Sequence, residues 1–304
     1  MQKIVPHLWF DTNAKAAAEF YAAVFPDAKV TSHTVMKNTP SGDCDVMKFE
    51  IMGYTFMSIS AGPYFKITPA ISFMVNFDAA IFENARELLD EAWNTLIVGG
   101  KVLMPLATYP FNERYGWVED SFGVSWQLSY SPKGGVSKPA IIPSMLFVGG
   151  LVGNAKVARD LYVSIFEEAS LGIEMYYPEG LESEQPNHLM YSDFKLKDQW
   201  FAVMDSARNH EFSFTEGVSL IINCDSQQEI DYYWEKLSAV PEAEQCGWLK
   251  DQFGVSWQIT PTRMTAMMQS GTAEQINRLV QAFLPMKKFD IATLEAAYNS
   301  PSHI

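Results

Sequence analysis

The chain has 304 residues, of which 48% are hydrophobic and 19% are charged, and its formal net charge is −14. This length and apolar content suit two globular domains with cores of their own. The acidic balance would repel a phosphate backbone, which argues against nucleic acid as a partner. No apolar run reaches the roughly 18 residues of a membrane span, so no membrane role is expected.

The N-terminus and the cysteines predict a cytoplasmic protein. Met1-Gln2-Lys3-Ile4 leads directly into strand-like sequence and is unlike a signal peptide. The three cysteines, Cys44, Cys224 and Cys246, are scattered and form no C-x-x-C pair. We therefore expect them to be reduced and structural.

Strand and helix patterns alternate along the first half of the chain. In chain order we predict a strand over 4–10, a helix after the N-cap Asn13, strands over 46–51 and 54–60, a strand over 71–77, a helix from about 79 to 96, and strands over 101–106 and 124–130. The turn Met52-Gly53 joins the first hairpin, and Gly99-Gly100 ends the second helix. The pattern is strand, helix, strands, and then the same again.

The second half of the chain repeats the first. Residues 116–127 return as residues 247–258 with nine of twelve positions identical, and Asn13-Ala14-Lys15 returns as Asn154-Ala155-Lys156. The predicted organisation is a first copy over 1–132, a linker over 133–139, a second copy over 140–262 and a C-terminal helical tail over 263–304. Trp126 and Trp257 should occupy equivalent buried positions, and the apolar stripe of the tail should dock on the body.

The repeated unit resembles a known family. An Asn-Ala-Lys helix that carries an aromatic pair and a closing Asp-x-Phe-Gly-x-x-Trp strand resemble the PhnB-like family of the glyoxalase/bleomycin-resistance (vicinal oxygen chelate) superfamily, here in a tandem two-domain form. The resemblance implies an α+β fold with two βαβββ units in each domain. It also implies that the two units of a domain pair their sheets into a cupped surface around one small-molecule site.

The resemblance also indicates site residues. In metal-dependent relatives the ligands come from the first and last strands of each unit. Carried over to the first copy, these positions are His7, Ser58 or Ser60, Ser72 and Gln127, the last standing where metal-using relatives have a glutamate. Because side chains alternate along a strand, the strand of Ser72 and the strand of Gln127 each have one polar face. That face either lines a cavity or meets solvent. The family fold favours the cavity.

The ligand count argues against a metal cofactor. A catalytic divalent ion needs about three ligands from His, Glu or Asp. The first copy offers only His7 and the neutral Gln127, so these two would hold an ion if one were bound, and a histidine hydrogen-bonded within its strand is the competing interpretation. The second copy offers Ser144, Ser219 and Gln258.

The segment from Thr108 to Gly116 is a further candidate. Its aromatic residues, including Tyr109, together with Arg114 could close over an anionic or planar ligand. The alternative is a surface loop with a routine ion pair. The second copy lacks an equivalent of this segment, because residues 239–247 contain neither arginine nor an aromatic ring.

Two functions compete on this basis. The first is a small-molecule-binding protein, with the ligand in the first copy near His7, Ser72, Arg114 and Gln127. The alternative is a metal-dependent enzyme of the lyase, isomerase or dioxygenase type at His7 and Gln127. A third interpretation makes the second copy a structural partner that has lost its site, and a homodimer is compatible with each. Methyltransferase activity, a label often given to the family, would need a glycine-rich turn, and no G-x-G-x-x-G occurs.

Overall fold

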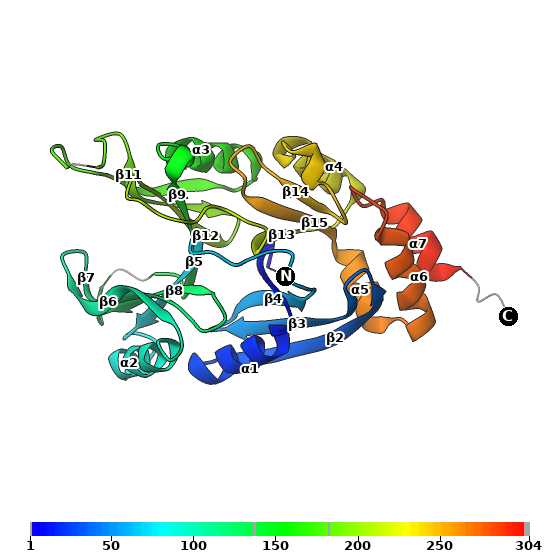
Figure 1. Cartoon of the computed structure of the whole chain (residues 1–304), viewed down its shortest axis with the longest axis horizontal. Coiled ribbons are helices and arrows are strands. Elements are labelled where there is room, and N and C mark those ends of the chain that lie inside the picture. The colour runs from blue at the N-terminus through cyan, green and yellow to red at the C-terminus, as the bar shows by residue number, and fades with distance from the viewer. Residues whose placement is uncertain (1, 136–137, 182, 301–304) are drawn as a thin grey trace.

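Two curved sheets form the frame of the molecule, with helices on the outside (Figure 1). The structure is a computed structural model, and it describes residues 2–135, 138–181 and 183–300. Val136 and Ser137 of the expected linker and residues 301–304 of the expected tail lie outside the described residues. No helix in the described ranges has the length and apolar character needed to cross a membrane.

The elements follow the repeat. The first copy contains β1 (Ile4–Phe10), α1 (Ala14–Val24), β2 (Lys29–Thr39), β3 (Gly42–Ile51), β4 (Tyr54–Ser60), β5 (Ile71–Asp78), α2 (Ala85–Leu96), β6 (Lys101–Tyr109), β7 (Asn112–Glu119) and β8 (Ser125–Ser131). The second contains β9 (Ile141–Val148), η1 (Gly149–Leu151), α3 (Ala155–Ile165), β10 (Ser170–Tyr176), β11 (Leu189–Leu196), β12 (Gln199–Ser206), β13 (Val218–Cys224), α4 (Gln227–Leu237), η2 (Pro241–Ala243), β14 (Trp248–Lys250) and β15 (Ser256–Pro261). The tail contains α5 (Thr262–Ser270), α6 (Ala273–Phe283) and α7 (Ile291–Asn299).

Each sheet combines one unit from each copy. The seven-stranded sheet has the order β14-β15-β13-β1-β4-β3-β2, and the eight-stranded sheet has the order β10-β11-β12-β9-β5-β8-β7-β6. Within the seven-stranded sheet the two units join where β1 pairs with β13, and within the eight-stranded sheet they join where β5 pairs with β9. Both pairings are antiparallel. The expectation that the two units of one domain pair their sheets is therefore wrong. Strand alternation fixes the face that a side chain occupies, but it does not select the neighbouring strand.

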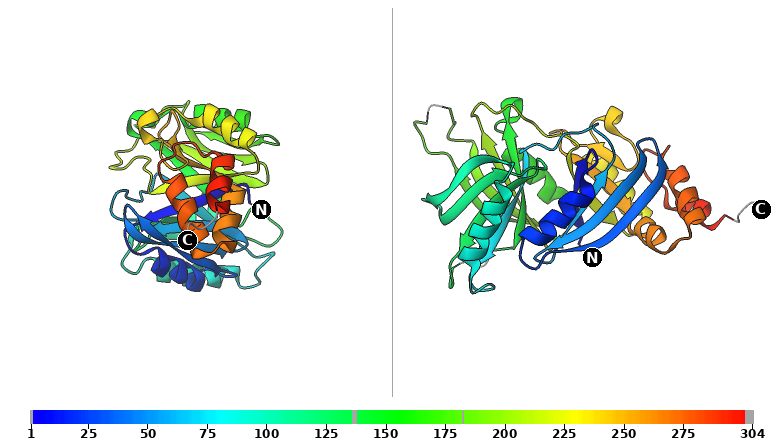
Figure 2. Two further views of the ribbon diagram at one scale, coloured as in Figure 1. Left: turned by 90° about the vertical axis from the view of Figure 1, so that its right-hand side faces the viewer. Right: turned by 60° about the horizontal axis from the view of Figure 1, so that its bottom comes forward.

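Within a copy, the two units are held together by side chains between the sheets and the helices. In the first copy, Phe73 of β5 lies 5.0 Å from Phe56 of β4 and 5.4 Å from Trp126 of β8, between ring centroids. The helices α1 and α2 lie on one outer side of the molecule, and α3 and α4 lie on the opposite side (Figures 1 and 2). The opposite face of each sheet is left for other contacts.

The repeated Asp-x-Phe-Gly-x-x-Trp motif has a structural role. Asp120 accepts hydrogen bonds from Tyr21 Oη at 2.9 Å and from Trp126 Nε1 at 2.8 Å, and its other oxygen accepts two backbone N–H groups. Asp251 makes the equivalent bonds with Tyr162 at 2.7 Å and with Trp257 at 2.9 Å. Both tryptophans are fully buried, as the repeat predicts. The motif closes the core of each copy.

One helix begins later than its pattern suggests. The expected start near residue 79 is wrong, since α2 begins at Ala85. The Asp78 carboxylate accepts a hydrogen bond from the backbone N–H of Ala80 at 2.7 Å. This local bond stabilises a turn before the helix, as short acidic side chains commonly do.

The tail occupies the place where the second copy has no hairpin. The second unit of the second copy lacks a strand equivalent to β6, and its strand β14 has only three residues. The backbone N–H groups of Cys246 and Gly247 instead donate to the carbonyls of Met286 and Lys287, both at 2.7 Å. A small apolar cluster made of Leu279, Val280, Phe283, Phe289 and Leu294 completes the contact. The tail therefore stabilises the edge of the seven-stranded sheet.

Candidate functional site

A single row of paired residues crosses the inner face of the seven-stranded sheet. From edge to edge the row contains Ser32, Lys48, Met57, His7, Ser219, Ser256 and Lys250. Directly paired residues point to the same side of a sheet, so these side chains share one face. We call this surface the histidine face, and it also includes Trp9, Trp248 and Gln258.

His7 lies at the centre of this face, on β1. It is 5% exposed, and its Nδ1 atom has no hydrogen-bond partner among the described residues. Burial lowers the pKa of His7 to about 3, so the imidazole is neutral near pH 7. A neutral imidazole has one donor and one acceptor nitrogen. Because buried polar atoms are normally paired, the unpaired Nδ1 is the group of this face that lacks a partner.

The polar neighbours of His7 come from the second copy. Ser219 is the register partner of His7, and its hydroxyl accepts a hydrogen bond from Gln258 Nε2 at 2.9 Å. The residues beside His7 are therefore not those of the first copy with which it was expected to form a site. His7 and Gln258 share a face because β1 pairs with β13, which pairs in turn with β15.

Aromatic rings surround His7 on one side. The His7 ring packs edge-on against Trp248 at 5.6 Å, and Trp9 lies 5.9 Å from Trp248, between ring centroids. Phe65, from the segment between β4 and β5, stacks on Trp248 at 6.4 Å. The rings of Trp9, Phe65 and Trp248 are half-buried, whereas His7 is buried. The arrangement provides flat apolar contacts at the rim and a polar group beneath them.

The eight-stranded sheet has a corresponding inner face with a different network. Tyr115 Oη donates to Gln127 Oε1 at 2.5 Å, and Gln127 Nε2 donates to Ser72 Oγ at 2.7 Å. Ser144, the register partner of Ser72, stands where the other sheet has His7. Its Oγ atom is buried and has no partner among the described residues. We call this surface the serine face.

The structure separates the predicted site residues. His7 lies on the histidine face, whereas Ser72 and Gln127 lie on the serine face. Ser58 is paired with Leu8 and points into the core beneath α1, so it shares no surface with His7. Its alternative Ser60 accepts a hydrogen bond from the backbone N–H of Ala14 at 3.0 Å and thereby caps α1, since the side chain of Asn13 makes no capping bond.

The expected loop around Arg114 is a hairpin. Tyr109 ends β6 and Arg114 lies on β7, where side chains alternate between faces. Arg114 points to the helix side and pairs with Asp90 of α2 at 2.7 Å, whereas Tyr115 points to the serine face. The routine ion pair is thus the correct interpretation for Arg114. Tyr109 packs against Tyr115 at 5.7 Å and lines a pocket of about 410 Å³ at the hairpin tip.

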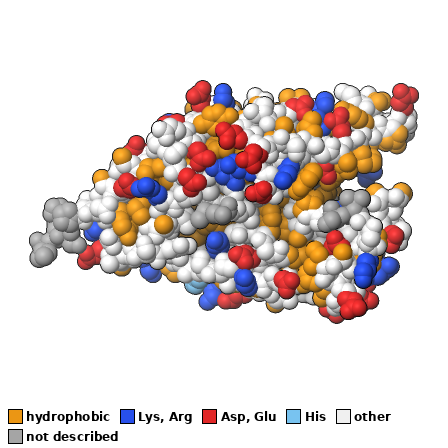
Figure 3. Space-filling model, turned by 180° about the vertical axis from the view of Figure 1, so that it is seen from behind, with side chains coloured by type: hydrophobic (Ala, Val, Ile, Leu, Met, Phe, Trp, Pro, Cys, Tyr) orange, Lys and Arg blue, Asp and Glu red, His pale blue; other side chains and the backbone are white. Residues whose placement is uncertain are grey.

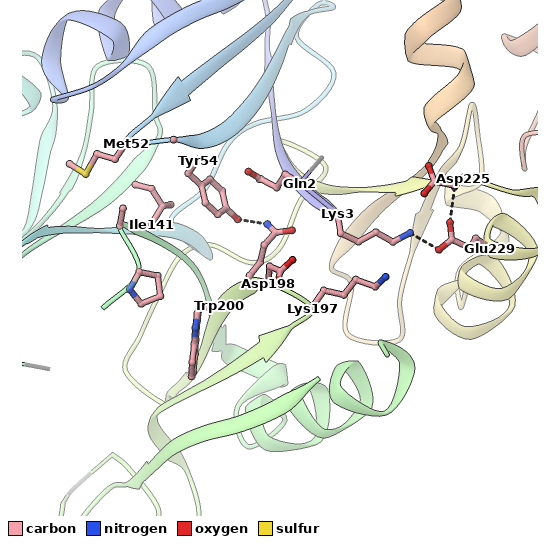
Figure 4. A pocket seen from close by; sticks show the side chains of 14 residues that line it. Gln2, Lys3, Met52, Tyr54, Ile141, Lys197, Asp198, Trp200, Asp225 and Glu229 are labelled. Atoms are coloured by element: carbon pink, nitrogen blue, oxygen red, sulfur yellow. Dashed lines mark hydrogen bonds and ion pairs between the residues drawn. The ribbon is translucent and has the colours of Figure 1, made fainter. Parts of the chain in front are cut away.

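A pocket of about 580 Å³ lies between the copies, where the sequence predicted no site (Figure 4). Several of its polar groups are bonded to protein groups. Lys3 Nζ donates to Glu229 Oε1 at 2.8 Å, and Gln199 Nε2 donates to Tyr54 Oη at 2.9 Å. Gln199 also bonds both backbone groups of Ile4. These contacts indicate an interface that holds the two copies together.

Comparison with known proteins now places the chain. The family model described as 3-demethylubiquinone-9 3-methyltransferase matches residues 2–129 and again residues 139–260. The chain belongs to this family. It is PhnB-like and contains two tandem copies of the domain.

Solved structures are also similar to the chain. The PhnB protein from Bacillus cereus is 32% identical over 43% of this chain and 100% of its own, with a TM-score of 0.39. Glyoxalase I from Zea mays is 8% identical over 88% of this chain and 96% of its own, with a TM-score of 0.55, which shows a shared fold. Among proteins with curated descriptions, none matches the chain.

The positions at which a metal was expected do not fit an ion. The four positions on first and last strands are His7, Met57, Ser219 and Gln258 on one face, and Ser144, Ala202, Ser72 and Gln127 on the other. The first set contains one imidazole and no carboxylate, and the second set contains neither, whereas a catalytic divalent ion needs about three such ligands. Within the described residues, no group of three or more His, Cys, Asp or Glu is placed to bind one. The two expected ligands, His7 and Gln127, lie on different sheets.

Proposed function

We propose that this PhnB-like protein binds a small molecule on the histidine face. The observation that carries the proposal is the buried, neutral His7 with an unpartnered Nδ1. Leaving such an atom unpaired costs about 1–3 kcal/mol, and a ligand that bonds it would recover this cost. The three half-buried rings of Trp9, Phe65 and Trp248 supply apolar contact area around it. A few polar groups among aromatic contacts are typical of small-molecule sites.

The histidine face suits a ligand better than the other candidates. In the pocket between the copies, Lys3, Tyr54 and Gln199 are already bonded to protein groups. On the serine face, Gln127 is held by Tyr115 and Ser72. Gln258 has no equivalent of Tyr115, because Cys246 holds that position in the repeat. Its amide oxygen therefore adds an acceptor beside His7.

Native mass spectrometry tests the proposal, combined with a ligand-observed NMR screen of small-molecule fragments. We expect a bound species or fragment set in the wild type that is lost in His7→Ala and weakened in Gln258→Ala. Gln127→Ala is the matched control on the serine face and should retain binding. Binding that survives His7→Ala, or a wild type that binds nothing in either measurement, would overturn the proposal.

A further inference from the structure

The two inner faces carry opposite charges at equivalent positions of their rows. On the histidine face, the row contains Lys48, next to Ser32 at one edge, and Lys250 at the other edge. On the serine face, Ala202 and Ser144 correspond to Met57 and His7, and the row continues to Asp193. Towards its other edge the row contains Glu119, the partner of Ser125, and it ends in Lys101, the partner of Glu119. In a chain whose net charge is −14, the two lysines of the histidine face mark a local exception.

One of the two lysines has no counter-ion. Lys250 Nζ pairs with Glu216 Oε1 at 2.7 Å. Glu50, two residues along β3 from Lys48, pairs with Lys29 at 3.3 Å. Lys48 itself is half-buried and makes no ion pair with any described residue. Because His7 is neutral and Lys250 is paired with Glu216, Lys48 is the unpaired positive group of this face.

The spacing suits a small ligand. Neighbouring strands lie about 4.8 Å apart, so the backbone of Lys48 lies about 10 Å from that of His7, across β4. A lysine side chain can extend over Met57 and shorten that gap. Trp9, on the same strand as His7 and two residues further on, places its ring on the same face. The serine face has Leu146 at the corresponding position of β9 and so lacks this ring.

We propose that the ligand of the histidine face is a planar aromatic carboxylate, an inference that rests on the function proposed above. Its ring packs against Trp9 and Trp248, its carboxylate binds Lys48, and His7 and Gln258 bond a polar ring substituent. A flat apolar rim selects planarity, and an unpaired ammonium selects the negative charge. The face thereby excludes neutral and non-planar analogues of the same size.

Three probes separate these requirements: benzoate, benzamide and cyclohexanecarboxylate. Indole N–H signals of the ¹⁵N-labelled full chain report their dissociation constants. We expect benzoate to bind more tightly than the neutral benzamide and more tightly than the non-planar cyclohexanecarboxylate. In Lys48→Met, the dissociation constant of benzoate should rise about tenfold or more, while that of benzamide stays unchanged. Asp193→Asn, at the equivalent position of the serine face, is the matched control and should change neither constant.

The outcomes distinguish the two proposals. Loss of both benzoate and benzamide in His7→Ala, with a loss confined to benzoate in Lys48→Met, supports both. Dependence on His7 without any effect of Lys48→Met overturns the anionic ligand and leaves the small-molecule site intact. Failure of benzoate to bind the wild type, or equal affinity for benzoate and benzamide, also overturns it. Unchanged melting of Lys48→Met shows that any loss reflects the missing charge.

Discussion

The two inner faces of this protein are built on equivalent strands of the repeat and share a glutamine–serine hydrogen bond, yet they differ in the groups around it. The serine face satisfies Gln127 internally, through Tyr115 and Ser72. The histidine face leaves His7 Nδ1 without a partner and places Trp9 beside it. A common backbone therefore supports one face with internal bonds and another with groups left for a ligand.

The difference is not one between the two copies. Each face combines the first unit of one copy with the second unit of the other, so His7 and Gln258 lie on one face although most of the chain separates them. Loss of a group from either copy changes a face to which both contribute. The outer surface follows no such division, since on the face shown in Figure 3 basic side chains are interspersed with acidic ones.

The largest effect is expected at the edge of the seven-stranded sheet. Deleting residues 263–304 removes the helices that replace the missing hairpin and exposes the edge at Cys246 and Gly247. Burial of the tail cluster is worth several kcal/mol at about 25 cal/mol per Å², so the melting temperature should fall by roughly 5 °C or more. Differential scanning calorimetry measures it. Removal of residues 301–304 alone is the control, and equal melting of the two truncations would contradict the docking contact.

The cores of the two copies should respond alike, unlike their inner faces. Asp120→Ala leaves the donors of Tyr21 and Trp126 unpaired, and Asp251→Ala does the same in the second copy. Each change should cost about 3 kcal/mol. Urea unfolding of both variants checks this, with Asp198→Ala, at an exposed turn, as the control. A cost in one copy only would show that the two networks are not equivalent.

The core was predictable from the sequence, and the partners of the strands were not. Trp126 and Trp257 recur within identical flanking residues, so their equivalence could be predicted. The pairing of β1 with β13 could not, because His7 alternates with apolar residues in the same way whichever strand lies beside it. Arg114 was misplaced for a different reason. Once its segment forms a hairpin, alternation puts it on the face opposite Tyr115.

His7 should make the stability of the folded protein depend on pH. Its pKa is about 3 in the folded state, below the unfolded value near 6.5, so between these values the unfolded chain binds the extra proton. Stability contributed in this way is present above pH 6.5 and is lost as the pH falls. From pH 7 to pH 5 the wild type should lose about 2 kcal/mol more than His7→Gln.

Urea titrations at both pH values measure that difference. Burial raises the pKa of Asp120 and of Asp251, which favours the folded state on acidification, but both groups are common to the two proteins and cancel in the comparison. His33→Gln, at an exposed imidazole beside Asp45, is the control. Identical pH slopes for wild type and His7→Gln would mean that the His7 ring is solvated in the folded protein.

The smallest effect is expected on the serine face and tests why it differs from the histidine face. Tyr115→Phe removes the hydroxyl that bonds Gln127 Oε1 but keeps the ring packed against Tyr109. The loss of one buried hydrogen bond should cost about 1 kcal/mol. It also makes Gln127 resemble Gln258, whose oxygen has no tyrosine beside it. If internal bonding is what closes the serine face to ligands, Tyr115→Phe should bind benzamide there even in a His7→Ala background, and NMR signals of Trp117 would report it. No binding in that double variant would instead assign the difference between the faces to the aromatic rim around His7.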